Sequence, residues 1–150
     1  MSRDIRITVC VLAAVLLGGC AGNGEGLDEN GRPLAEGAPA GPLEPSIESI
    51  QDHVFTPRCI SCHSGAAARN NLHLDDAQTS YDNLVGVRAT EYAVLFRVAA
   101  GDPDNSYLIH KLEGTQEVGS RMPLNGPYLD TETIGVIRQW ITDGAPPPAP

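Results

Sequence analysis

Apolar positions recur at the spacing of an α-helix in four separate stretches, and each stretch has recognisable end signals. The first starts at Ser46, a good N-cap residue, and is expected to end before Pro57. The second starts at Asp75, with Gln78 three residues on as in a capping box, and is expected to stop at Gly86. The apolar positions are Ile47, Ile50, Val54 and Phe55 in the first stretch and Ala77, Tyr81, Leu84 and Val85 in the second.

The third stretch has Asp102 as its N-cap, Pro103 at the first helical position and Gly114 as its end signal. The fourth runs from Asp130 to Gly144. Their apolar positions are Leu108 and Leu112 in the third, and Ile134, Ile137, Trp140 and Ile141 in the fourth. A short apolar run over 92–98 does not distinguish strand from coil, and there is no internal repeat. The pattern predicts one small all-α domain over residues 46–145.

Residues 1–19 have the features of an export signal, with two arginines followed by an apolar run over 7–17. That run is much shorter than the roughly 20 residues of a spanning helix. It ends in Leu-Gly-Gly followed by Cys20, which resembles the lipobox of bacterial lipoproteins, and the resemblance implies lipidation of Cys20. The alternative is an ordinary cleaved signal. Several acyl chains would give stable membrane attachment. By analogy with lipoprotein sorting in Gram-negative bacteria, Ala21 after the cysteine leans weakly towards the outer membrane.

Residues 20–45 are predicted to be a flexible lipidated tether. Six Gly and four Pro fall among residues 21–45, with almost no large apolar side chain, so this segment cannot offset its ordering entropy by burial. The Pro-rich segment 146–150 is predicted to be a disordered tail.

The chain is acidic, with a formal net charge of -9. Loss of residues 1–19 removes two Arg and one Asp, so Lys plus Arg falls from 10 to 8, Asp plus Glu from 19 to 18, and the charge becomes -10. This balance argues against nucleic acid as a partner, and against binding of anionic lipid by charge. It suits docking to basic patches on redox partner proteins.

Two of the four cysteines form the most informative motif of the chain. Cys10 lies in the signal and Cys20 at its end, so only Cys59 and Cys62 remain, with His63 directly after them. A Cys-x-x-Cys-His run suits covalent haem, because two thiols at this spacing meet two vinyl groups and the imidazole binds iron. The alternatives are a thiol-redox pair, which would need a βαβ context, and half of a zinc site, which would need a second ligand pair.

Met122 is the candidate for the sixth iron ligand. It is the one methionine outside the signal and lies in a polar loop directly before Pro123. A thioether ligand raises the reduction potential and closes the iron to oxygen. His110 is the substitute ligand, whereas His53 and His73 are expected to face solvent.

Several apolar side chains are candidate walls of the haem pocket: Phe55, Ile60, Leu72, Leu74, Leu108, Leu124, Ile137 and Trp140. A dry wall disfavours the extra charge of ferric haem. Candidate hydrogen-bond donors to a haem propionate are Trp140, Arg121 and Tyr128.

The motifs together resemble class I monohaem cytochromes c. The resemblance rests on Phe55-x-x-x-Cys59-x-x-Cys62-His63, a later Met122-Pro123 and a final helix with Trp140. Residues 101–108, followed by Arg121-Met122-Pro123, are similar to the subgroup of planctomycete-type cytochrome c domains. The resemblance covers about residues 46–145. It implies an all-α fold around one covalent haem c, with the first and last helices crossing. It assigns attachment to Cys59 and Cys62, and axial ligation to His63 and Met122.

The sequence therefore predicts an electron carrier, not an enzyme, that is lipid-anchored to a membrane and faces the bacterial periplasm. It would exchange single electrons with periplasmic redox partner proteins. Three alternatives remain: a five-coordinate haem sensor or catalyst, a haem subunit of a periplasmic oxidoreductase, and a structural envelope lipoprotein stapled by its haem.

Overall fold

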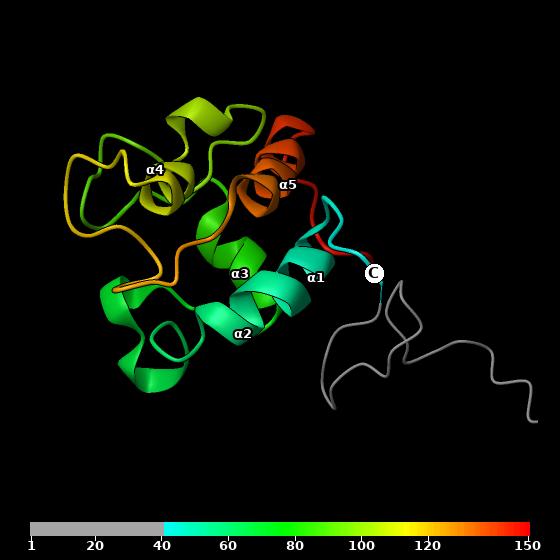
Figure 1. Cartoon of the computed structure of the whole chain (residues 1–150), viewed down its shortest axis with the longest axis horizontal. Coiled ribbons are helices and arrows are strands. Elements are labelled where there is room, and N and C mark those ends of the chain that lie inside the picture. Colours follow the sequence, from blue (N-terminus) through cyan, green and yellow to red (C-terminus); the bar gives the residue numbers. More distant parts are fainter. Residues whose placement is uncertain (1–40) are drawn as a thin grey trace, which may run out of the picture.

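The computed structural model of the chain describes residues 41–150. The predicted signal peptide (1–19), Cys20 and most of the predicted tether lie outside the described residues. Within residues 41–150 the structure is a small all-α domain of four helical segments and short 3-10 turns, without β-strands (Figure 1). The predicted all-α class is confirmed. No helix of this part of the chain has both the length and the apolar character needed to cross a membrane.

The first helical segment combines α1 (Ile47–Ile50), a π-helical turn (Gln51–Phe55) and α2 (Thr56–Arg58). Ser46 caps it as predicted, because its Oγ accepts a hydrogen bond from the Ser49 N–H at 3.2 Å. The predicted end before Pro57 is wrong. In the π-turn the Thr56 N–H donates to the Gln51 carbonyl, five residues back, so Pro57 falls in a new first turn where its missing N–H is tolerated.

The helix α3 (Ala77–Leu84) begins and ends close to the predicted positions. Its cap is Asp76 instead of Asp75, since Asp76 Oδ1 accepts from the Thr79 N–H at 2.8 Å. Asp75 is engaged elsewhere and accepts a hydrogen bond from the Gly65 N–H at 3.0 Å. Of the two neighbouring carboxylates, Asp76 caps the helix and Asp75 binds a residue ten positions away.

The predicted helix from Asp102 to Gly114 is two elements. Asp102 caps a 3-10 turn (Pro103–Asn105), and α4 (Tyr107–Glu113) follows separately. Ser106 interrupts the helix with extended backbone angles, and its Oγ donates to the Asp102 carbonyl at 2.8 Å. Gly114 ends α4 in the left-handed region, at φ 84°, as predicted.

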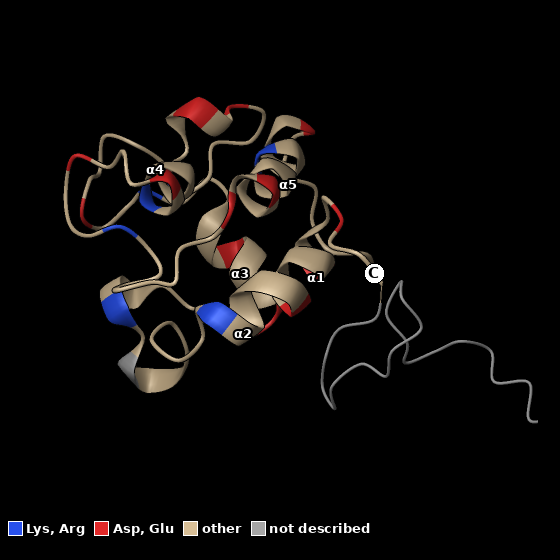
Figure 2. Ribbon diagram, viewed as in Figure 1, with Lys and Arg blue, Asp and Glu red and all other residues tan. Residues whose placement is uncertain are grey.

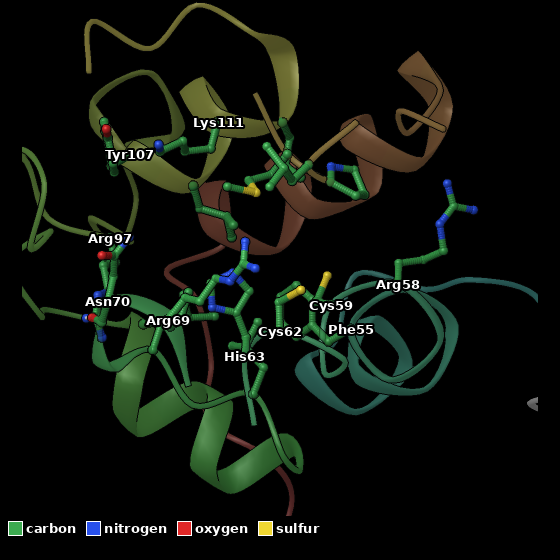
Figure 3. Close-up of a pocket in the computed structure, with 18 of the residues that line it drawn as sticks. Phe55, Arg58, Cys59, Cys62, His63, Arg69, Asn70, Arg97, Tyr107 and Lys111 are labelled. Atoms are coloured by element: carbon green, nitrogen blue, oxygen red, sulfur yellow. The ribbon is translucent and has the colours of Figure 1, made fainter. Parts of the chain in front are cut away.

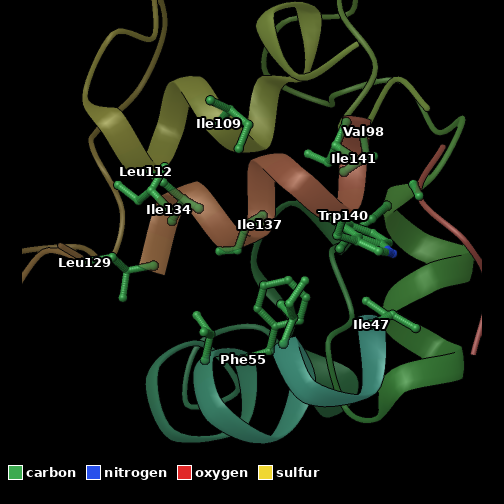
Figure 4. Close-up of a cluster of buried hydrophobic side chains, with 14 of the residues drawn as sticks. Ile47, Phe55, Val98, Ile109, Leu112, Leu129, Ile134, Ile137, Trp140 and Ile141 are labelled. Atoms are coloured by element: carbon green, nitrogen blue, oxygen red, sulfur yellow. The ribbon is translucent and has the colours of Figure 1, made fainter. Parts of the chain in front are cut away.

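The last helix, α5 (Thr131–Thr142), forms the centre of the domain. Asp130 caps it by accepting from the Thr133 N–H at 2.7 Å, which confirms the predicted start. Figure 4 shows α5 between α4 and the α1 segment, with Ile137 and Trp140 turned toward Phe55 and Ile47. The buried cluster comprises Ile47, Ile50, Val54, Phe55, Leu74, Leu84, Val98, Ile109, Leu112, Leu129, Ile134, Ile137, Trp140, Ile141 and Ala145.

Residues 85–98 are a loop that folds back on itself through isolated bridges between Val85 and Val98 and between Arg88 and Phe96. A further bridge joins Phe96 to Ser106 at the start of α4. This loop therefore connects α3 to α4 and carries the segment 89–97 to the side of the domain where the candidate site lies.

The tail that composition predicts to be disordered lies against the domain. The Trp140 indole Nε1 donates to the Pro146 carbonyl at 3.1 Å, and the Ala149 N–H donates to Glu48 Oε1 at 2.6 Å. At the other end of the described chain, His53 Nε2 is 3.0 Å from the Gly41 carbonyl oxygen. Both ends of the described chain thus meet beside α1 (Figure 1).

Candidate functional site

A cavity of ≈ 270 Å³ lies between α4, the loops on either side of it and the segment that follows α2. Cys59, Cys62, His63 and Met122 all line it. The structure therefore brings together at one site the four residues that sequence reasoning singled out from two distant segments. Figure 3 shows the two cysteines and His63 side by side at the edge of this cavity.

The two cysteines are held by a tight turn at the end of α2. The Cys59 N–H donates to the Phe55 carbonyl at 2.8 Å, and the Cys59 carbonyl accepts from the N–H groups of Cys62 and His63 at 3.1 and 3.0 Å. Both thiols are free. This turn is what places two thiols and an imidazole on the same wall.

The environment of Cys59 does not suit thiol-redox chemistry. Burial raises the pKa of the Cys59 thiol to about 11, although the neighbouring Arg58 charge acts in the opposite direction. Redox-active cysteines have lowered pKa values because the thiolate is the reactive form. A raised thiol pKa is therefore the opposite of what a nucleophilic redox cysteine needs.

The His63 imidazole has unused binding capacity. Its Nδ1 is buried and has no hydrogen-bond partner. Burial lowers the pKa of His63, while the nearby carbonyls of Arg69 and Leu72 act in the opposite direction. Neither carbonyl is placed to form a hydrogen bond with Nδ1. A neutral imidazole is the form that binds metal. The backbone is fixed separately, since the Leu74 N–H donates to the His63 carbonyl at 2.8 Å.

Met122 reaches the cavity from the loop that follows α4. Its N–H donates to the Lys111 carbonyl at 2.8 Å, and its partly buried side chain packs against the hydrophobic core. Pro123, Leu124 and Gly126 continue the same wall. The loop therefore supplies a thioether to the cavity that also holds the His63 imidazole.

Five of the predicted wall residues line the cavity, namely Phe55, Leu72, Leu74, Leu108 and Leu124. The other three predictions are wrong. Ile137 and Trp140 are fully buried in the core, because the inner face of α5 is covered by α1 and α4. Ile60 packs against the edge of that core and does not line the cavity.

The predicted donors to a propionate also lie outside the cavity lining. The Trp140 indole is occupied by the Pro146 carbonyl. Arg121 Nε donates to the Leu112 carbonyl at 2.9 Å, and its guanidinium carbon lies 4.0 Å from the centre of the Tyr128 ring. These three side chains stabilise the surrounding loops instead.

Sequence reasoning missed the charge of the cavity. Four cationic side chains and one carboxylate line it, namely Arg58, Arg69, Arg97, Lys111 and Glu91. A chain with a net charge of -9 thus has a cavity whose lining is positive. Figure 2 shows blue segments at α2, in the loop that follows it and on α4, while red segments are scattered over the rest of the ribbon.

Arg97 is the most unusual of these cations because it is only 8% exposed. It donates to the carbonyls of Asn83 at 2.8 Å, Asn70 at 2.9 Å and Asn71 at 3.2 Å, and to Thr90 Oγ1 at 3.1 Å. No carboxylate among residues 41–150 forms an ion pair with it. Burial lowers its pKa. A single arginine within the apolar run 92–98 was the sequence signal that could have found it.

The side chains of the remaining three histidines make polar contacts outside the cavity. His110 Nδ1 lies 3.0 Å from Thr115 Oγ1 and its Nε2 lies 2.9 Å from the Asp104 carbonyl oxygen. His53 Nδ1 lies 2.9 Å from the Ser49 carbonyl oxygen, and His73 lies 3.7 Å from an Asp75 oxygen. None of the three lines the cavity, so His110 is not positioned there as a substitute for Met122.

The zinc alternative needs a second pair of ligands near Cys59 and Cys62. In the described part of the chain no three side chains of His, Cys, Asp or Glu gather in a metal-binding arrangement.

Comparison of the chain with protein-family models, with curated proteins and with solved structures found no match. Function is therefore inferred from the residues of this cavity.

Proposed function

We propose that the chain is a monohaem c-type cytochrome that carries single electrons. The observation that carries the proposal is the convergence of Cys59, Cys62, His63 and Met122 on one cavity. The orphaned His63 Nδ1 fits a bound metal cofactor. In its finer form the proposal is a cytochrome c-like helical domain around one haem c.

The roles of the chain's residues follow from their chemistry. Cys59 and Cys62 would hold the group through thioether bonds, and His63 and Met122 would be the axial ligands. Bound there, haem supplies reversible one-electron chemistry at iron. Phe55, Leu74 and Leu108 exclude water from the cavity. If His63 and Met122 both bound the iron, no position would be left open for a substrate, which favours a carrier over an enzyme.

The positive lining supports the same proposal independently. A haem brings two carboxylates, and burial of carboxylates needs cationic or hydrogen-bonding partners. Arg97 is a buried guanidinium without an ion-pair partner in residues 41–150, and Arg69 is a second cation of the same lining. These charges make the cavity suitable for a flat apolar ligand that carries acidic groups.

The deciding experiment is optical spectroscopy on protein produced with haem-maturation machinery, comparing wild type with Met122→Ala. We expect haem that resists extraction under denaturing conditions, and a sulfur-to-iron charge-transfer band that Met122→Ala lacks. Reduced wild type should bind carbon monoxide slowly, and the variant rapidly.

Colourless or freely extractable protein would reject the haem assignment. Covalent haem without the band in wild type would favour the five-coordinate sensor. An optical spectrum with the sulfur-to-iron band, together with a reduction potential at which no periplasmic partner can exchange electrons, would favour the structural lipoprotein.

We also propose that lipid on Cys20 attaches the protein to a membrane facing the periplasm, with the outer membrane favoured. The support is the lipobox-like end of the export signal. Cys20→Ser should move the protein from the membrane fraction to the soluble periplasmic fraction. Retention of that variant in the membrane fraction would reject the lipid.

A further inference from the structure

Lys111 on α4 is a buried cation with three acceptors around it. Its side chain is 10% exposed, and its Nζ forms an ion pair with Glu91. The same Nζ donates to the carbonyls of Val118 at 3.2 Å and Ser120 at 3.3 Å. An ammonium group has three donors, so these three acceptors account for all of them.

The two carbonyls belong to the loop that leads from α4 to Met122. Tyr107, on the first turn of α4, donates its hydroxyl to the Val118 carbonyl at 2.7 Å. The loop is therefore bound by side chains of α4 at two points, and Figure 3 shows Lys111 and Tyr107 extending from this helix toward each other. Met122 follows Ser120 by two residues, and its own N–H donates to the Lys111 carbonyl, so the contacts of this loop with α4 together set the position of the thioether.

Gly119 shows how closely the loop passes over the ion pair. Its backbone has φ +73°, and a Cβ atom added there would meet Lys111 Nζ at 2.5 Å and Glu91 Oε2 at 2.8 Å. A Cβ there would force the flexible ends of Lys111 and Glu91 to move apart, and the positive φ itself favours glycine. The loop and the ion pair thus fit together as one unit.

We propose that the Lys111–Glu91 ion pair is a positioning device that holds the loop 114–121 so that Met122 stays in the cavity. Lys111 touches the loop and not the reacting atoms, so it acts through Met122. The segment that carries Glu91 also carries Arg97, which means that the pair joins the methionine loop to the charged wall of the cavity. This inference rests on the proposed function, since it gives Met122 a ligand role.

The test compares matured wild type with Lys111→Met and Gly119→Ala. Lys111→Met keeps the length of the side chain and removes the donors, while Gly119→Ala disturbs the same contact from the loop. We expect both variants to lose at least half of the sulfur-to-iron band and to bind carbon monoxide at least tenfold faster when reduced. The matched control is Arg138→Met, which removes ion pairs to Asp104 at 2.7 Å and Glu113 at 2.8 Å without touching the loop. It should lower stability and keep the band.

A folded Lys111→Met variant with an intact band and unchanged carbon monoxide binding would overturn the inference. If that variant does not fold, Glu91→Gln is tested by amide hydrogen exchange. The hydrogen-bonded amides of Thr115 and Met122 should exchange at least tenfold faster, and those of α5 at the wild-type rate. Equal exchange in the loop would also overturn it. A wild-type protein without covalent haem would instead reject the proposed function itself, and the hydrogen-exchange result would still decide whether the pair holds the loop.

Discussion

The side chain of Gln51 should be one of the most important polar groups for stability. It is only 3% exposed and links three parts of the fold. Its Nε2 donates to the Leu74 carbonyl at 2.9 Å and to Thr56 Oγ1 at 3.1 Å, and its Oε1 accepts from Ser80 Oγ at 2.6 Å. The Leu74 N–H in turn donates to the His63 carbonyl, so this network also supports the backbone of the candidate ligand.

The cost of Gln51→Leu follows from the groups that it leaves behind. The Leu74 carbonyl and the fully buried Ser80 hydroxyl both lose their partner, at about 1–3 kcal/mol for each buried unsatisfied group. The added apolar contact of leucine offsets part of this, so we expect a loss of about 3 kcal/mol. Ser80→Ala alone should cost about 1–2 kcal/mol, because it leaves Gln51 Oε1 unpaired. The double variant should lose about 1 kcal/mol less unfolding free energy than the two single variants lose together, since the two side chains share one hydrogen bond.

Urea unfolding followed by far-UV circular dichroism measures these free energies, with an unchanged m-value as the sign that the unfolded state is the same. Gln139→Leu is the matched control, because Gln139 is exposed and donates only to Asp143 on its own helix; it should change stability by less than about 0.5 kcal/mol. A Gln51→Leu variant as stable as this control, or a strictly additive double variant, would show that the buried network does not stabilise the fold.

Two further predictions concern the charges of the cavity. In protein loaded with the proposed haem, Arg97→Met should lower the reduction potential by on the order of 50 mV, because loss of a nearby positive charge favours the ferric state. Redox titration measures this, and Arg88→Met, which changes an arginine outside the lining, should leave the potential unchanged. The hydrogen bond from Lys111 holds the pKa of Glu91 below its ordinary value of 4.5. The ion pair therefore stabilises the fold at a pH above 4.5, and this stabilisation is lost as the pH falls through the pKa of Glu91 in the folded state. Unfolding free energies measured from neutral to acidic pH should therefore fall more steeply in wild type than in Glu91→Gln, and parallel curves would contradict the assignment.

The sequence predicts those helix ends that depend on local chemistry. Ser46 and Asp130 cap their helices and Gly114 ends α4, because each signal acts within a few residues of itself. The errors arise where a distant group decides. Asp76 replaces Asp75 as a cap because Gly65 binds Asp75, and the first helix continues past Pro57 because a π-turn shifts its hydrogen bonds.

In the candidate site, too, the residues of a local motif were predicted, and those brought in by distant segments were missed. Cys59, Cys62 and His63 form a compact motif whose placement on one wall of the cavity follows from their spacing. Arg97 and Lys111 reach the cavity only through the path of the loop 85–98 and the orientation of α4, which no local pattern encodes. Trp140 was misplaced because its indole partner is the Pro146 carbonyl, in a tail whose composition suggests no fixed position.

The meeting of both ends of the described chain beside α1 has a practical consequence. Every residue that lines the cavity falls between Phe55 and Gly126, whereas the C-terminus lies beside α1 (Figure 1). A reporter fused at the C-terminus, or a linker to an electrode surface, would therefore leave the mouth of the cavity open.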